Sequence, residues 1–273
     1  MSAGRWITRL AAPAKLTRSL RVIGARSDGY HLIEAEMVSI DLADHLELRV
    51  GDGLEALDGA GDPMPDLGPH DQNLVSRALR LAGRRAHVRI HKRIPAGAGL
   101  GGGSSDAAAI LRWAGFTDVE RAAGIGADVA FCLVGGRAAV SGVGERVRRL
   151  EPVDLTFTLL TPDLHCDTPS VYRRWDGLGG PVGDHGNDLE PAAVDLYPRL
   201  AEARDRLGDL TGIRPRLAGS GATWFVEGEW DVPGGVVART WSPRATCRVP
   251  DADAVCDEAA CGASSSSSAC GAS

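Results

Sequence analysis

A glycine-rich segment at residues 95–106 is the strongest chemical signal in the sequence. It reads Pro-Ala-Gly-Ala-Gly-Leu-Gly-Gly-Gly-Ser-Ser-Asp, after an alternating apolar stretch typical of a strand and before an alanine-rich stretch typical of a helix. Glycines allow positive φ angles and let a backbone approach a ligand closely. Free N–H groups and the positive end of the helix dipole would then point at one spot. The segment therefore predicts a phosphate-binding loop.

Other interpretations of this segment are weaker. A flexible linker is rarely bracketed by a strand and a helix. Gly97, Gly99 and Gly102 match a dinucleotide-binding pattern, but no clear apolar strand ending in an acidic residue follows the helix, as that fold requires. A Walker A loop is excluded because no lysine follows the glycines. Ser104 and Ser105 can either cap the helix or face a phosphate or a magnesium ion.

Composition limits the classes of function. The chain has 273 residues, of which 44% are apolar, and a formal net charge of -6. It can bury a core, and its charge argues against a nucleic-acid or anionic-membrane surface as the main partner. No apolar run approaches the roughly 20 residues needed to cross a bilayer. The stretch before Asp28 has no acidic residue, which faintly suggests a transit peptide, although a basic first strand explains the composition better. We expect the protein to be cytoplasmic and to be a monomer or a homodimer.

Two residue types stand out by their distribution. Lys15 and Lys92 are the only lysines among 30 basic residues, which draws attention to Lys15 in its arginine-rich surroundings. The six cysteines form no C-x-x-C pair, which argues against a structural zinc site, and the length of the chain argues against a disulfide framework.

Apolar periodicity predicts the elements that would position the loop. Leu46, Leu48 and Val50 share one face of a strand, and residues 51–71 indicate a loop or a weak hairpin. Strands are also expected over 86–94, 155–160 and 236–241, with a strand, a glycine turn and a second strand over 213–227. Helices are expected over 74–81, 105–114 and 191–207. Residues 251–273 have the composition of a disordered tail.

The loop and its surroundings resemble the GHMP kinases. Residues 95–109 are similar to the phosphate loop of that superfamily, and the triple glycine before Ser-Ser-Asp-Ala-Ala resembles one branch. The branch phosphorylates a cytidine diphosphate-linked methylerythritol in non-mevalonate isoprenoid biosynthesis. Four more segments match it in order: Ala-Pro-Ala-Lys-Leu at 12–16, Asp-Gly-Tyr-His at 28–31, Gly-Ala-Asp-Val at 126–129 and Gly-Ser-Gly-Ala-Thr at 219–223. Residues 73–75, 168–172 and 187–190 are weaker matches.

The resemblance implies an ATP-dependent small-molecule kinase that uses Mg²⁺, for which no carboxylate ligand can be assigned. Phosphoryl transfer needs positioning and charge stabilisation more than covalent help. Asp128 would accept or orient the proton of the acceptor hydroxyl, and Lys15 would stabilise negative charge on the acceptor oxygen and the phosphate. ATP would lie along Pro95, Ala96, Gly97, Ala98, Gly99, Leu100, Gly101, Gly102, Gly103, Ser104 and Ser105.

The same resemblance places the acceptor in a cleft. Its cytosine would lie against Tyr30, His31 and Tyr172, with the tyrosines stacking and the histidine forming a hydrogen bond. The other implied acceptor contacts are Thr17, Thr168, Gly219, Ser220 and Gly221. Three features depart from the family pattern: Thr17 replaces Asn, Ala130 replaces Pro, and the stretch between residues 105 and 128 is short.

The implied fold is α+β with two domains. Residues 1–150 would form a nucleotide-binding domain similar to domain 2 of ribosomal protein S5, and residues 151–250 a ferredoxin-like substrate domain. The expected partner is a small-molecule substrate, without nucleic acid or membrane. Three alternatives stay open: a GHMP kinase for mevalonate-type, homoserine or sugar acceptors, a degenerate homologue that binds nucleotide without turnover, and, least favoured, a dinucleotide dehydrogenase.

Overall fold

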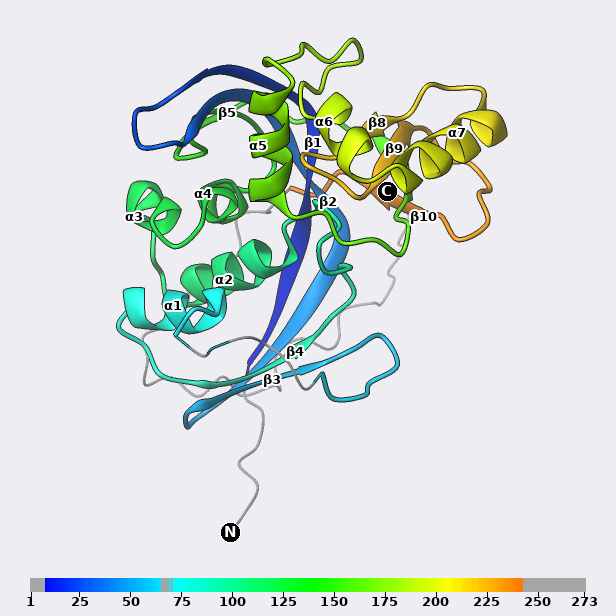
Figure 1. Ribbon diagram of the computed structural model, residues 1–273. Helices are drawn as coiled ribbons and strands as arrows, with labels where there is room; N and C mark the ends of the chain where they lie inside the picture. The colour runs from blue at the N-terminus through cyan, green and yellow to red at the C-terminus, as the bar shows by residue number, and fades with distance from the viewer. Residues whose placement is uncertain (1–7, 65–68, 70, 243–273) are drawn as a thin grey trace, which may run out of the picture.

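The computed structural model describes residues 8–64, 69 and 71–242 (Figure 1). One sheet is built from strands between residues 8 and 149, and a second sheet from strands between residues 156 and 239. The mixture of helices and strands matches the expected α+β class. The domain boundary near residue 150 stays a prediction, and the tail expected at 251–273 lies outside the described residues.

Two long strands carry the first sheet. β1 (Thr8–Ala25) and β2 (His31–Arg49) pair antiparallel along almost their whole length. The other edge of β2 is shared by β4 (His87–His91) and β5 (Arg137–Gly142), and the sheet is completed by β3 (Gly53–Leu57) and β6 (Arg146–Arg149). One long strand therefore holds the whole sheet together.

One expectation for this sheet needs correction, and a second is confirmed with an addition. Leu46 and Leu48 are buried as predicted, but Val50 is 86% exposed because β2 ends at Arg49. The stretch 51–71 contains a weak hairpin, as predicted: Leu57 forms an antiparallel bridge with Pro63, and the N–H of Met64 donates to the carbonyl oxygen of Ala56 at 2.8 Å. The first arm of this hairpin, β3, also pairs in parallel with β4, which was not predicted. That pairing is long-range, so the Gly- and Asp-rich local pattern does not show it.

Helices cover one face of the first sheet (Figure 1). They are α1 (Leu74–Leu81), α2 (Gly102–Trp113), α3 (Val119–Ala123) and α4 (Ala127–Val134). The side chain of Asn73 accepts the N–H of Val75, which explains why α1 begins where the sequence predicts. The predicted serine cap of α2 is wrong: the helix begins earlier, after Gly101, whose φ of 69° is in the left-handed region.

The second sheet has the strand order of a ferredoxin-like domain. β7 (Thr156–Leu160), β8 (Arg216–Leu217), β9 (Trp224–Glu227) and β10 (Val236–Arg239) lie in the order β10-β7-β9-β8 and are antiparallel throughout. In chain order this is 4-1-3-2, the arrangement of a split β-α-β unit with one further strand. Three helices stand between β7 and β8: α5 (Thr168–Gly177), α6 (Glu190–Leu196) and α7 (Arg199–Thr211).

The single helix predicted over residues 191–207 is wrong. Two helices, α6 and α7, occupy this stretch and are separated by Tyr197 and Pro198. Proline has no N–H to donate and its ring clashes with the preceding turn, so it begins a new helix rather than continuing the old one.

The two sheets share a hydrophobic core. One cluster of buried side chains joins Leu20 of β1 and Phe131 of α4 to Leu160 of β7 and Trp224 of β9. Apolar burial is the dominant favourable contribution to folding. The relative position of the two halves is therefore stabilised by the same contacts that stabilise each half.

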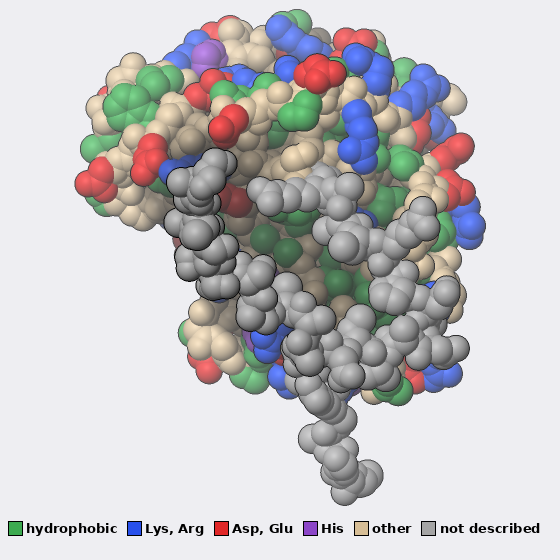
Figure 2. Space-filling model, turned by 180° about the vertical axis from the view of Figure 1, so that it is seen from behind, with side chains coloured by type: hydrophobic (Ala, Val, Ile, Leu, Met, Phe, Trp, Pro, Cys, Tyr) green, Lys and Arg blue, Asp and Glu red, His purple; other side chains and the backbone are tan. Residues whose placement is uncertain are grey.

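Charged side chains on the surface are mixed in sign. On the face in Figure 2, basic and acidic side chains of the described residues are interspersed along the upper rim rather than separated by sign. Within the described ranges, no helix combines the length and apolarity that a membrane span requires.

A chain of ion pairs also connects the two sheets. Arg18 of β1 contacts Glu36 of β2, and its second nitrogen lies 2.8 Å from Glu227 of β9. Arg137 extends the chain from Glu36 at 3.0 Å, and Arg216 extends it from Glu227 at 2.8 Å. The pKa of Glu36 is lowered, by the hydrogen bond from Arg137 and the charge of Arg18, which outweigh the opposing effect of burial. The pKa of Glu227 is lowered chiefly by the hydrogen bond from Arg18.

We expect Arg18→Ala to lower the free energy of unfolding at pH 7 by about 1–3 kcal/mol, the range for hydrogen bonds to charged groups. Because the folded-state pKa values of Glu36 and Glu227 are depressed, their favourable contribution is present above the ordinary carboxylate pKa. It disappears as the pH falls through the folded-state values. Urea unfolding at pH 7 and at pH 3 measures both effects, so the difference between variant and wild type should shrink at pH 3.

Arg9→Ala is the matched control, because Arg9 lies on the same strand in an exposed pair with Glu47. It should change the free energy of unfolding by less than about 0.5 kcal/mol. An equal effect of the two variants would contradict a special role for Arg18.

Candidate active site

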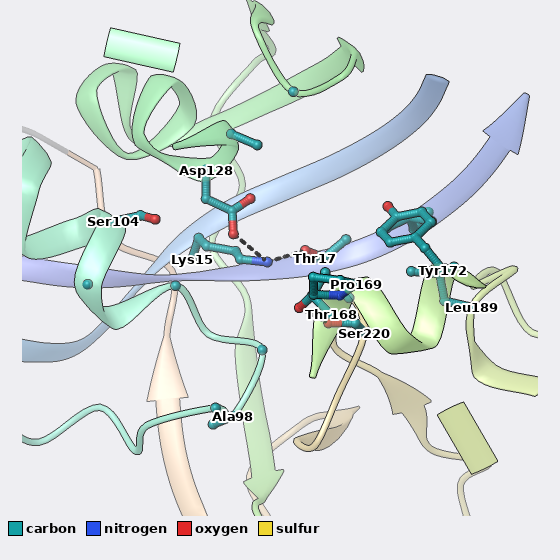
Figure 3. A pocket seen from close by; sticks show the side chains of 18 of the residues that line it. Lys15, Thr17, Ala98, Ser104, Asp128, Thr168, Pro169, Tyr172, Leu189 and Ser220 are labelled. Atoms are coloured by element: carbon teal, nitrogen blue, oxygen red, sulfur yellow. Dashed lines mark hydrogen bonds and ion pairs between the residues drawn. The ribbon is translucent and has the colours of Figure 1, made fainter. Parts of the chain in front are cut away.

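A cavity of about 830 Å³ lies where the phosphate loop, β1, α4 and α5 meet (Figure 3). Strands from the first sheet and a helix from the second half of the chain both contribute to its wall. The sequence-predicted residues that line it are Lys15, Thr17, Tyr30, His31, Asp128, Thr168, Tyr172, Gly219, Ser220 and the loop residues 95–99 and 101–104. The structure thus brings together residues that are widely separated in the sequence.

The phosphate loop needs its glycines for conformation and for space. Gly97, Gly99 and Gly101 have φ angles of 67°, 75° and 69°, which strain any residue with a Cβ atom. A Cβ at Gly99 would lie 2.4 Å from the carbonyl oxygen of Ala218, and one at Gly101 would lie 2.8 Å from Cγ of Lys15. The loop is therefore held between Lys15 of β1 and the turn at residues 218–223, which we call the third glycine turn.

Lys15 stands at the centre of the cavity. Its backbone N–H donates to the carbonyl oxygen of Leu100 at 3.0 Å, at a register shift between Pro13 and Lys15 in the pairing of β1 with β2. Its Nζ lies 3.3 Å from Oδ2 of Asp128 and donates to Oγ1 of Thr17 at 3.1 Å, as the dashed lines in Figure 3 show. The Lys15 side chain is only 7% exposed and that of Asp128 is 33% exposed, so a ligand can reach the carboxylate.

The departures from the family pattern do not disturb this pair. Asp128 lies in the first turn of α4, although Ala130 replaces a proline there and the stretch before it is short. Ala130 is fully buried in the helix, and the Thr17 hydroxyl takes a place beside the ammonium. Lys15 and Asp128 are therefore adjacent in spite of the three departures.

Aromatic side chains gather at the end of the cavity farthest along β1. Tyr30 and His31 come from the turn between β1 and β2, and Tyr172 comes from α5. The rings of His31 and Tyr172 are stacked, with centroids 4.7 Å apart and planes at 25°, while Tyr30 is 63% exposed. One face of the Tyr172 ring is thus covered by His31.

Three predicted binding residues do not line the cavity. Leu100 is buried in the core with Ala98 and Phe225. The Ser105 hydroxyl donates to the carbonyl oxygen of Pro13 at 2.8 Å, so it fastens α2 to β1 instead of facing a phosphate. Gly221 lies behind the turn, where an added Cβ would be 3.2 Å from Sγ of Cys166.

Comparison with known proteins agrees with this geometry. Residues 73–136 match the model for the GHMP kinase N-terminal domain. A 4-diphosphocytidyl-2-C-methyl-D-erythritol kinase from Pelotomaculum thermopropionicum is 40% identical over 258 residues, covering 80% of this chain and 88% of that protein. The enzyme of the same name from Paracoccus denitrificans is 37% identical, covering 80% and 85%. The chain belongs to this kinase family.

Solved structures support the family and its fold. A crystal structure of 4-(cytidine 5'-diphospho)-2C-methyl-D-erythritol kinase superposes with a TM-score of 0.68 and 31% identity, covering 86% of this chain and 100% of that one. Mevalonate kinase from Methanococcus jannaschii has a TM-score of 0.54 at 12% identity, covering 88% and 100%, and shares the fold alone. The expected GHMP kinase fold is confirmed.

Sequence reasoning missed a group of charges beneath the phosphate loop. Lys92, which lines the cavity, contacts Asp44 and lies 2.9 Å from Oδ2 of Asp106. Oδ1 of Asp44 accepts the N–H groups of Arg93 and Ile94 at 2.5 and 2.8 Å, which holds the strand end that leads into the loop. Burial raises the pKa of Asp106 to about 7, against the opposing effect of Lys92. The available signal was that Lys92 is the second of only two lysines.

Asn187 has a structural role that accounts for the weak family match at residues 187–190. Its side chain is buried and donates to the carbonyl oxygens of Leu217 and Gly219 at 2.9 and 2.7 Å, while it accepts the N–H of Leu189 at 2.9 Å. An added Cβ at Gly219 would lie 3.4 Å from Nζ of Lys15. Asn187 therefore holds the third glycine turn at its distance from the central lysine.

We expect Asn187→Asp to lower stability by about 2 kcal/mol or more. A carboxylate cannot donate, so it would leave two buried carbonyl oxygens without partners and repel them. Thermal unfolding measures the loss. Asn73→Asp is the matched control, because aspartate caps a helix about as well as asparagine and should leave the melting temperature nearly unchanged. Equal melting temperatures for both variants would show that the Asn187 hydrogen bonds contribute little.

Proposed function

We propose that this chain catalyses ATP-dependent phosphorylation of the 2-hydroxyl of 4-diphosphocytidyl-2-C-methyl-D-erythritol in non-mevalonate isoprenoid precursor biosynthesis. The names of its relatives suggest this acceptor. The observation that carries the proposal is the order of groups along one cavity: the phosphate loop, then the Lys15–Asp128 ion pair, then the aromatic end. That order suits a reaction between a polyphosphate and a base-linked alcohol.

ATP would bind with its phosphates against the loop. The loop glycines and the beginning of α2 face the cavity, where backbone N–H groups and the helix dipole favour an anion. The ammonium of Lys92 lies beside the first residue of the same helix, 3.2 Å from where a Cβ of Gly102 would be. The loop glycines, the beginning of α2 and Lys92 all line the cavity.

The donor set at the loop also fits Mg²⁺ bound mainly through ATP. The Ser104 hydroxyl is an oxygen donor that lines the cavity. Protein sites for Mg²⁺ usually supply one or two such ligands and leave the rest to phosphates and water. Among the described residues no cluster of three His, Cys, Asp or Glu side chains would form a cage for a metal. Bound there, Mg²⁺ would neutralise charge on the phosphates.

The ion pair would act on the acceptor hydroxyl. Asp128 is partly exposed to the cavity and can accept the hydroxyl proton as the oxygen approaches the γ-phosphate. Lys15, fixed by Thr17 and by the backbone of Leu100, would stabilise the negative charge that develops on the transferred group. Both residues stand on regular elements, β1 and α4, which limits their movement during the reaction.

We expect Asp128→Asn to lower kcat by about 10²–10⁴, the usual contribution of a positioned acid–base group, with ATP affinity almost unchanged. Single-turnover transfer from labelled ATP and an equilibrium ATP titration measure the two quantities. Asp118→Asn is the matched control: Asp118 caps α3, a role that asparagine fills equally well. Turnover of Asp128→Asn within a few-fold of wild type would remove Asp128 from the mechanism.

The acceptor itself is tested by a screen with ATP. We expect phosphorylation of the cytidine diphosphate-linked methylerythritol and none of mevalonate, homoserine or galactose. Methylerythritol phosphate without cytidine should show lower turnover as well as weaker binding, because remote binding energy positions the reacting hydroxyl. Phosphorus NMR detects the phosphorylated product and so shows which acceptors the protein uses. Equal use of the cytidine-free compound would contradict the proposed acceptor and favour another GHMP kinase activity.

A further inference from the structure

One face of α5 forms a wall of the cavity. After Thr168, the first residue of the helix, the residues that line the cavity are Pro169, Tyr172, Arg173 and Asp176. They are positions i, i+3, i+4 and i+7, which lie on the same side of an α-helix. Arg173 is therefore placed on the cavity side by its position in the turn, yet it has no role in the reaction described above.

This helix runs from the centre of the cavity to its aromatic end. At its start, the Thr168 hydroxyl oxygen lies 2.7 Å from that of Ser220, in the third glycine turn beside the central lysine. Near its other end, Oδ1 of Asp176 lies 2.8 Å from Nε2 of His31. Along a helix axis this stretch measures about 12 Å. Arg173 thus stands between the central ion pair and the aromatic side chains.

Arg173 is the least compensated cation of the cavity wall among the described residues. Lys15 and Lys92 are mostly buried, and each lies 3.3 Å or less from a carboxylate oxygen. The carboxylate paired with Arg173 is that of Asp167, at 3.8 Å, and the two side chains are 70% and 51% exposed. Asp167 also accepts hydrogen bonds from the N–H and the hydroxyl of Ser170. Exposed pairs of this kind contribute little, so the guanidinium is available to an anion in the cavity.

The Arg173 side chain also has donors to spare. A guanidinium carries five N–H groups in a planar fork. Nη2 of Arg173 donates to Oγ of Ser170 at 2.7 Å, and no second hydrogen bond joins this side chain to the described part of the chain. The fork matches the spacing of two oxygens on one phosphate group, which makes phosphate a preferred ligand of arginine.

We propose that Arg173 binds the diphosphate of the acceptor and so selects a diphosphate-linked alcohol over a free one. This inference rests on the proposed function. An acceptor with its hydroxyl at the central ion pair and its base at the aromatic end has its diphosphate between the two, along the face of α5 that carries Arg173. The phosphates of ATP lie against the glycine loop instead, so Arg173 serves the acceptor and not the donor.

The test uses cytidine diphosphate and cytidine, which differ only in the diphosphate, as inhibitors competing with the acceptor at saturating ATP. Arg173→Gln removes the charge and should raise the inhibition constant of cytidine diphosphate about tenfold or more, the effect of losing a charge-assisted hydrogen bond. The inhibition constant of cytidine should stay within about twofold. KM for the acceptor should rise with that of the diphosphate inhibitor, with kcat within about threefold and ATP affinity unchanged. A merely structural role would weaken both inhibitors alike.

Two further variants complete the experiment. Arg173→Lys keeps the charge without the fork and should recover part of the lost affinity for cytidine diphosphate. Arg174→Gln is the matched control on the same helix, since Arg174 pairs with Asp195 and does not line the cavity. It should leave both inhibition constants at their wild-type values.

The possible failures are distinguishable. In an enzyme that phosphorylates the cytidine diphosphate-linked acceptor, an unchanged inhibition constant of cytidine diphosphate in Arg173→Gln overturns this inference and leaves the proposed function standing. Weaker ATP binding in that variant, with cytidine diphosphate unaffected, overturns it as well and assigns Arg173 to the donor. A wild-type enzyme that transfers no phosphate to this acceptor overturns both proposals.

Discussion

The hydrogen bond from the backbone N–H of Lys15 to the carbonyl oxygen of Leu100 is the contact on which the rest of the site depends. It joins the phosphate loop to the strand that carries the lysine, at the point where β1 shifts its register against β2. Gly101 has no room for a side chain because its Cβ would lie 2.8 Å from Cγ of Lys15, and Gly99 has none because its Cβ would lie 2.4 Å from the carbonyl oxygen of Ala218. The position of the loop relative to the strand that carries Lys15 is thus set by main-chain geometry.

The alternation of β1 connects this chemistry to the stability of the fold. Successive side chains of a strand point to opposite faces. Thr17 therefore faces the cavity beside Lys15, while Arg18 faces the other way and joins Glu36 to Glu227 of the second sheet. The same strand that positions the reacting groups also ties the two halves together, so disturbing one is expected to disturb the other.

The arrangement of the aromatic side chains depends on how α5 packs against the first sheet. Tyr30 and His31 stand on the first sheet, whereas Tyr172, Trp175 and Asp176 stand on α5. The shared core around Phe131 and Trp224 fixes their relative position. The arrangement of these side chains is accordingly a property of the packed molecule, and a shift of α5 would change it without moving the Lys15–Asp128 pair.

Local sequence patterns predicted much of the secondary structure and of the candidate site. Helical spacing and the Asn73 cap predicted α1 over residues 74–81, and the run of glycines predicted a loop between β4 and α2. Collinear motifs predicted the family and most of the residues that line the cavity. Tertiary structure alone decided that Leu100 and Ser105 turn into the core, that Lys92 sits between Asp44 and Asp106, and that Asp176 holds His31. Those facts depend on strand register and on packing between distant segments, and neither is encoded in the periodicity of a single segment.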